Sequence, residues 1–155
     1  MDDVRWLDER EERAWRALQF MQMRLEGELA RQLAGSGLSY PDYVVLVALT
    51  DRPDTRMRLY ELAQILGWEK SRASHQVSRM VERGLVKKEK CASDRRGAYV
   101  VLTSRGRRAI EAAAPGHVTT VRRLFVDCLT LRQLDAVRAA AETVLARLGV
   151  EVPAA

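Results

Sequence analysis

Two predicted helices followed by a hairpin constrain the fold of this chain more than any other feature. The first, Leu59–Leu66, is apolar on one face and ends before Gly67, and the second is predicted over Lys70–Arg83. Two short strands, Leu85–Lys90 and Tyr99–Leu102, bracket a segment whose Ser, Asp, Arg and Gly content is typical of a turn. We therefore expect two helices joined by a tight turn and followed by a two-stranded hairpin.

The helix predicted over Lys70–Arg83 has a narrow apolar stripe and is otherwise polar. Ala73, Val77, Met80 and Val81 recur at helical spacing, so this stripe is expected to pack on the preceding helix. The remaining side chains can form hydrogen bonds, carry one net sign of charge and are expected outside the core: Ser71, Arg72, Ser74, His75, Gln76, Ser78 and Arg79.

Positive charge is concentrated in the same part of the chain. The formal net charge is +5, and residues 70–96 contain nine basic side chains against three acidic ones. A local excess of this kind favours an acidic partner such as nucleic acid. A solvated charged face is the alternative that charge alone leaves open.

Amphipathic helices are expected before this segment. Trp6–Ala34 carries apolar residues at intervals of three and four, which predicts one long helix. A capping box of Ser39 and Asp42 opens a second helix that runs to about Thr50. A loop is expected over residues 51–55.

Two further helices are expected after the hairpin. Thr103 caps a helix that meets Pro115 after about three turns, where a kink or break is expected. A capping box of Thr130 and Gln133 opens the last helix. The apolar faces of Trp6–Ala34 and Val118–Leu148 are too long for one small winged domain to cover, so they predict a partner surface.

This order of elements predicts a winged helix-turn-helix, in a fold that is mainly α with a small β hairpin (α+β). A helix fits the major groove of DNA, where Arg, Gln, Ser and His side chains meet the donors and acceptors of base edges. The hairpin, or wing, places cations against the neighbouring minor groove, and phosphate contacts supply most of the affinity. The arrangement therefore favours binding to double-stranded DNA.

Three motifs indicate a known family. They are CASDRRGAYVVLTSRG at Cys91–Gly106, RMVERGLVKKE at Arg79–Glu89 and LAQILG at Leu62–Gly67. They resemble the wing, the end of the recognition helix and the preceding helix of the MarR family of bacterial transcription regulators, particularly its SlyA-like members. The resemblance covers nearly the whole chain and identifies Lys70–Arg83 as the recognition helix.

The resemblance implies a homodimeric regulator, by family default a ligand-responsive repressor, that binds a pseudo-palindromic operator. It divides the chain into an N-terminal dimerisation helix at 1–37, a winged helix-turn-helix domain at 38–103 with its wing at 85–102, and C-terminal dimerisation helices at 104–155. It also implies a pocket for a small aromatic or anionic effector. Trp15, Tyr43 and His117 are candidates for lining this pocket, and packing in the core is the interpretation we prefer for them.

The predicted DNA-binding residues come from the recognition helix and the wing. The resemblance implies that His75 contacts a base and that Asp94 orients Arg96 for the minor groove. Arg79 is expected to contact the DNA backbone or to brace the helix. The full set is Lys70, Ser71, Arg72, Ser74, His75, Arg79, Asp94, Arg95 and Arg96.

Other function classes have little support in the sequence. No Gly-rich phosphate loop, nucleophile elbow or HExxH motif is present, so an enzyme is not expected. The two His and two Cys residues lack zinc-ligand spacing, so neither a metal nor a cofactor is expected, and Cys91 is interpreted as structural or incidental. No membrane helix or signal peptide is evident, which predicts a cytoplasmic protein. A nonspecific architectural DNA-binding protein and a winged-helix module for protein interaction are the alternatives.

Overall fold

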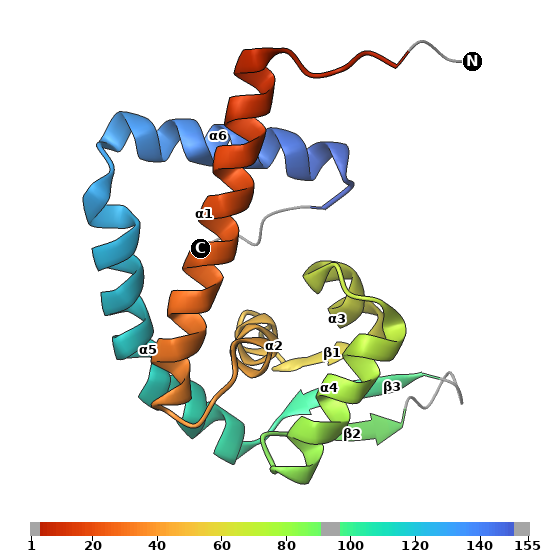
Figure 1. Ribbon diagram of the computed structural model, residues 1–155. Helices are drawn as coiled ribbons and strands as arrows, with labels where there is room; N and C mark the ends of the chain where they lie inside the picture. The colour runs from red at the N-terminus through yellow and green to blue at the C-terminus, as the bar shows by residue number, and fades with distance from the viewer. Residues whose placement is uncertain (1–3, 91–96, 151–155) are drawn as a thin grey trace.

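The computed structural model describes residues 4–90 and 97–150, and its elements are shown in Figure 1. The helices and strands, in chain order, are α1 (Glu9–Ala34), α2 (Tyr40–Thr50), β1 (Arg56–Arg58), α3 (Leu59–Leu66), α4 (Lys70–Glu82), β2 (Val86–Lys90), β3 (Ala98–Leu102), α5 (Ser104–Leu124), a short 3-10 helix (Val126–Cys128) and α6 (Leu131–Arg147).

The caps of the helices decide where they begin. Asp8 accepts hydrogen bonds from the amides of Arg10 and Glu11, so α1 begins at Glu9, three residues later than expected from Trp6. Ser39 forms the expected capping box with Asp42 at the start of α2. The predicted caps at the starts of α5 and α6 are also present.

The sheet has three strands in the order β1-β3-β2, where the sequence predicted two. β3 is central and pairs antiparallel with both neighbours, with Met57 opposite Val100 on one side and Val86 opposite Leu102 on the other. These four side chains are buried, so one face of the sheet covers the core. β1 was not predicted because three residues are too few to show the alternation of apolar and polar residues that indicates a strand.

One apolar core lies between the sheet and the helices α2, α3 and α4, which together with the sheet form the winged part. It includes Leu33 at the end of α1, Leu46 on α2, Leu62 on α3, Met80 on α4 and Ile110 on α5. Contributions from α1 and α5 mean that the helices on either side of the winged part share its core. The helices α1 and α5 thereby form a helical frame that holds the winged part.

The helix α5 runs without interruption through Pro115, so of the expected kink or break the break is absent, and the direction of α5 changes along its length in the view of Figure 1. Pro115 removes one backbone donor, which costs the helix a single hydrogen bond. Packing against α1 supports this region, because a Cβ added at Gly116 would lie 2.7 Å from Nε2 of Gln32. The close approach of the two helices explains why α5 continues.

The last helix and the first half of α1 project away from the core, as Figure 1 shows. α6 has no buried residue, and Leu33 is the one buried residue of α1. Several large apolar side chains here are therefore exposed: Trp15, Phe20 and Met23 on α1, Val137 and Val144 on α6, and Leu148 at the C-cap of α6.

Candidate nucleic-acid interface

The helices α3 and α4 form the expected pair joined by a tight turn. Gly67 ends α3 with φ of +63°, a left-handed conformation that favours glycine, and α4 starts three residues later. Gly84 ends the following turn with φ of +71°, after which the amide of Leu85 donates to the carbonyl of Met80. The second helix of the pair is thus α4, the predicted recognition helix, which ends one residue earlier than expected.

The buried side of α4 differs from the predicted stripe at two positions. Ala73, Val77 and Met80 are buried as expected, whereas Val81 is exposed. Gln76, expected outside, is only 3% exposed, and its side-chain amide donates to Oδ1 of Asp42 at 2.7 Å. Gln76 follows Ala73 by three residues and therefore shares its face, and a partner for the buried amide overrides the preference of Gln for solvent.

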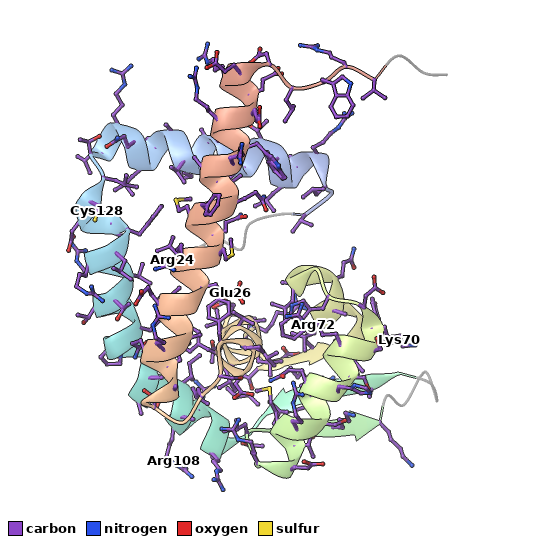
Figure 2. All side chains as sticks on the ribbon, viewed as in Figure 1. Arg24, Glu26, Lys70, Arg72, Arg108 and Cys128 are labelled. Carbon is purple, nitrogen blue, oxygen red and sulfur yellow. The ribbon has the colours of Figure 1, made fainter. Side chains whose placement is uncertain are left out.

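The opposite side of α4 is exposed and carries most of the predicted contact residues. Lys70, Ser71, Arg72 and His75 are exposed, and Ser74 is half-buried. Figure 2 shows Lys70 and Arg72 near the start of α4. This face combines positive charge with hydroxyl and imidazole groups, which is the chemistry that phosphates and base edges recognise.

Arg72 and Arg79 are held by neighbouring side chains. The guanidinium of Arg72 lies 4.6 Å from the centre of the Trp68 ring, a cation–π contact between the turn and the first turn of α4. Trp68 is itself partly buried against the core. The guanidinium of Arg79 donates to Oε1 of Gln76, which corresponds to the bracing role expected as one of its two alternatives.

The hairpin lies beside α4. Its strands β2 and β3 match the two predicted strands to within one residue. The predicted wing residues Asp94, Arg95 and Arg96, and also Cys91, lie outside the described residues. Within the described part, Nζ of Lys88 on β2 donates to Oγ of Ser78 on α4 at 3.0 Å. Sequence reasoning missed this lysine, whose place on a strand directly after the recognition helix was the available signal.

Two basic residues, Arg56 and Arg58 on β1, lie on the face of the sheet that points away from the core. The guanidinium of Arg56 lies 4.3 Å, and that of Arg58 5.2 Å, from the centre of the Tyr99 ring. Arg56 also contacts the carboxylates of Asp54 and Glu89. Neither arginine was predicted as part of the interface, because both lie on the unpredicted strand β1.

A cavity of about 1000 Å³ lies between the helical frame and the winged part. Tyr43 and His117 line it with ring centres 4.3 Å apart, whereas Trp15 does not line it and is exposed. Tyr43 also belongs to the core, so for this residue both interpretations hold. The remaining walls are mostly apolar, with Arg52, Asp51 and Gln64 among the polar residues that line them.

Burial shifts the pKa values of the rings at this cavity in the direction that favours their neutral forms. It lowers the pKa of His117 and raises the pKa of Tyr43, and burial together with the charge of Glu26 raises the pKa of Tyr40. Nδ1 of His117 is buried without a hydrogen-bond partner among the described residues. A neutral imidazole and neutral phenols therefore line the cavity at neutral pH.

The substitution His117→Phe is expected to reduce the loss of stability in mild acid. Because the pKa of His117 is lowered from 6.5 in the folded chain, the unfolded chain binds a proton more readily, and the free energy of unfolding falls as the pH drops below about 6.5. Urea denaturation at several pH values between about 7 and 5 measures this dependence. His75→Phe at an exposed site is the control, and an unchanged pH dependence in His117→Phe would contradict the assignment.

Other kinds of site find no support in residues 4–90 and 97–150. No group of three or more His, Cys, Asp and Glu residues gathers there in a way that could hold a metal ion. No helix of this part is long and apolar enough to cross a membrane. Cys128 is exposed near the junction of α5 and α6, on the side of the molecule away from the hairpin in Figure 2.

The chain is similar to known proteins both in sequence and in structure. The model of the MarR family matches residues 36–97. The transcriptional regulator HosA of Escherichia coli is 35% identical over 79 residues, which cover 50% of this chain and 56% of HosA. The chain thus matches little more than half the length of this curated relative.

Two solved structures from Streptomyces coelicolor match over nearly their whole length. The MarR family regulator AbsC is 39% identical, with a TM-score of 0.86 over 94% of this chain and 98% of AbsC. Sco3205, a MarR family regulator crystallised in complex with DNA, is 35% identical, with a TM-score of 0.88 over 99% of this chain and 98% of Sco3205.

Proposed function

This chain belongs to the MarR family of transcriptional regulators, and from that membership we propose that it is a homodimeric repressor that binds a pseudo-palindromic operator and responds to a small ligand. The family is one of regulators and not of enzymes. We place the protein in the cytoplasm, where its DNA target would be accessible.

The exposed polar face of α4 is the observation that carries this proposal. The packing of Ala73, Gln76, Val77 and Met80 turns the opposite side of the helix outward, beside the hairpin. A helix presented in this way fits the major groove. The similarity to Sco3205, which was crystallised in complex with DNA, supports DNA binding by this chain.

We assign the contacts by their position on α4. Ser71 and His75 lie on the outward face and read base edges, whereas Lys70 and Arg72 at the start of the helix bind phosphates. The stack on Trp68 holds the guanidinium of Arg72 in place for this contact. Ser74 and Arg79 complete the surface of the helix, and Asp94, Arg95 and Arg96 supply the wing contacts that the family resemblance implies.

A second copy of this chain is the partner that the exposed helices require. A helix of the length of α6 derives most of its stability from packing, yet none of its residues is buried in a single chain. Val144 on α6 is 58% exposed, Leu148 at the C-cap of α6 is 68% exposed, and Trp15 on α1 is 54% exposed. Apolar surface on helices at both ends of the chain fits a two-fold interface built by residues 1–37 and 104–155.

The cavity between the frame and the winged part is the proposed effector site. Its apolar walls, aromatic rings and Arg52 suit a small aromatic or anionic compound. A ligand that binds better to a spacing of the two winged parts that does not match adjacent major grooves would shift the population away from the DNA-binding form. Operator titrations with benzoate or phenol added test this, and an unchanged affinity with both would count against it.

The experiment that tests the function is selection of duplexes from a random pool by the purified protein, followed by titration at two salt concentrations. A regulator should prefer the selected duplex over a scrambled one by about a thousandfold or more, with two chains per duplex. Equal binding to all duplexes, lost as salt rises, would indicate the architectural alternative. No binding would indicate the protein-interaction alternative.

The substitution His75→Ala is expected to weaken binding to the selected duplex by about 1–3 kcal/mol, because a base contact is lost. Fluorescence anisotropy with the selected and the scrambled duplex measures this loss and its sequence dependence. Binding to the scrambled duplex should change little. An equal loss on both duplexes would make His75 a phosphate contact instead of a base contact.

A further inference from the structure

One buried carboxylate lies at the centre of a network that joins three separate segments: the loop before α2, the start of α2, and α4 with its C-cap residue Arg83. Asp42 is 2% exposed, and it accepts hydrogen bonds from Nε2 of Gln76 at 2.7 Å and from Nη1 of Arg83 at 2.6 Å. Nη2 of Arg83 also donates to the carbonyl of Gly37, in the loop between α1 and α2. We call Asp42, Gln76, Arg83 and this carbonyl the Asp42 cluster.

The carboxylate remains charged in spite of its burial. Burial by itself raises the pKa of Asp42, but hydrogen bonds from Ser39 and Arg83, together with the charge of Arg83, outweigh it and lower the pKa. The carboxylate oxygens then accept from the amide of Ser39 as well as from the two side chains of the cluster. A buried charge persists only where its bonds are satisfied in this way.

Capping of α2 does not explain these contacts. The capping box is complete with the reciprocal bonds between Ser39 and Asp42. The contacts of Asp42 with Gln76 and Arg83 lie outside it and reach α4 and its C-terminal end. Gln76 and Arg83 are seven residues apart, about two helical turns, and therefore lie on the same side of the helix.

Two attachment points two turns apart restrain a helix more than one point does. The packing of Ala73, Val77 and Met80 holds α4 against the core. Two polar contacts two turns apart add fixed points that resist both rotation and sliding of the helix. A rotation of α4 by about 10° would move the tips of its side chains by on the order of 1 Å. Hydrogen bonds to base edges tolerate a few tenths of an ångström, so the orientation of α4 decides whether His75 can read a base.

We propose that the Asp42 cluster positions the recognition helix for sequence-specific binding, with Asp42 as its central positioning residue. The cluster sets the rotation of α4 relative to α2 and, through Gly37, relative to the end of α1. It contributes to the discrimination between DNA sequences without contacting DNA. This inference rests on the proposed function, because it concerns how α4 reads its duplex.

The test compares two variants of the cluster with a matched control. Asp42→Asn removes the charge at the centre, and Arg83→Gln removes the partly exposed partner, so that a folded variant is available even if the first is unstable. Ser39→Ala is the control, because it removes the hydroxyl that caps α2 and leaves the bonds to Gln76 and Arg83 in place. All three proteins are assayed below their unfolding transitions.

The first measurement is the ratio of affinities for the selected and the scrambled duplex. We expect the cluster variants to lose about tenfold or more of this ratio, with unchanged binding to the scrambled duplex at low salt. Ser39→Ala should lower the unfolding midpoint and keep the ratio. A ratio that stays within about twofold of the wild type in Asp42→Asn or Arg83→Gln would overturn the proposal.

The second measurement is hydrogen exchange of backbone amides in the DNA-free protein. The cluster variants should exchange faster in α4 and in residues 35–39 and remain unchanged in α3, whereas Ser39→Ala should affect the start of α2. Unchanged exchange in α4 would likewise overturn the proposal. If the wild type shows no sequence preference, the proposed function fails, and this measurement still decides whether the cluster restrains α4.

Discussion

The substitution Val144→Asp is expected to convert the protein into a monomer and to weaken operator binding at least about 100-fold. Val144 is 58% exposed in a single chain and lies on the apolar side of α6 with Val137, and Leu148 at the C-cap continues this side. A carboxylate on this side would have to lose its hydration in the interface without a partner. Two linked winged parts bind two half-sites far more tightly than one part binds one half-site, so the loss of the dimer costs most of the affinity.

Ala139→Asp is the matched control for this prediction. Ala139 lies on the opposite side of the same helix and is exposed, so the same carboxylate remains in water there. Sedimentation equilibrium measures the oligomeric state, and anisotropy with the selected duplex measures the affinity. A Val144→Asp variant that stays dimeric would show that α6 does not form the interface.

The substitution Gly106→Ala is expected to lower the free energy of unfolding by about 1–3 kcal/mol or more. A Cβ at this position would lie 2.1 Å from the carbonyl oxygen of Leu85 and 2.9 Å from Cδ1 of Leu102. The first of these atoms belongs to the backbone between α4 and β2, so it cannot move aside as a flexible side chain can. The start of α5 or the hairpin must shift, and the recognition helix is directly joined to the displaced segment.

Gly27→Ala on α1 provides the comparison. An added Cβ there meets only the tip of the Arg31 side chain, at 3.9 Å, and alanine is favoured over glycine inside a helix by about 0.5–1 kcal/mol. Urea denaturation at one fixed protein concentration, followed by circular dichroism, compares the two variants with the wild type. Equal stability of Gly106→Ala and the wild type would mean that the backbone of Leu85 lies farther from Gly106 in solution than in the structure.

The boundaries of the helices were predictable where local chemistry sets them. The caps Ser39, Thr103 and Thr130 each accept a hydrogen bond from an amide three residues ahead, and all three helices begin where these residues predict. Leu59–Leu66 also matches the prediction, because Gly67 ends that helix with a positive φ. Such signals depend only on residues within one helical turn.

Features that depend on distant partners were not predictable from local patterns. β1 exists because β3 offers it a free edge, and its three residues carry no alternation long enough to read. Gln76 is buried because Asp42, 34 positions earlier, accepts its hydrogen bond. The continuity of α5 through Pro115 similarly depends on packing against α1, at the other end of the chain.

The candidate interface was predicted in part. The exposed positions of Lys70, Ser71, Arg72 and His75 follow from helical periodicity alone. The contacts that hold them do not, because the stack of Arg72 on Trp68 and the bond between Lys88 and Ser78 join separate elements. Their roles at the DNA remain predictions for the experiments above.

The absence of α6 from the core has a consequence for how a gene of this kind can duplicate and diverge. Because no residue of α6 is buried in the single chain, substitutions there can accumulate without unfolding the winged part. After duplication, changes on α6 and α1 could stop the two products from pairing with each other while both still read the original operator. Separate regulatory circuits would then arise before the recognition helices themselves had changed.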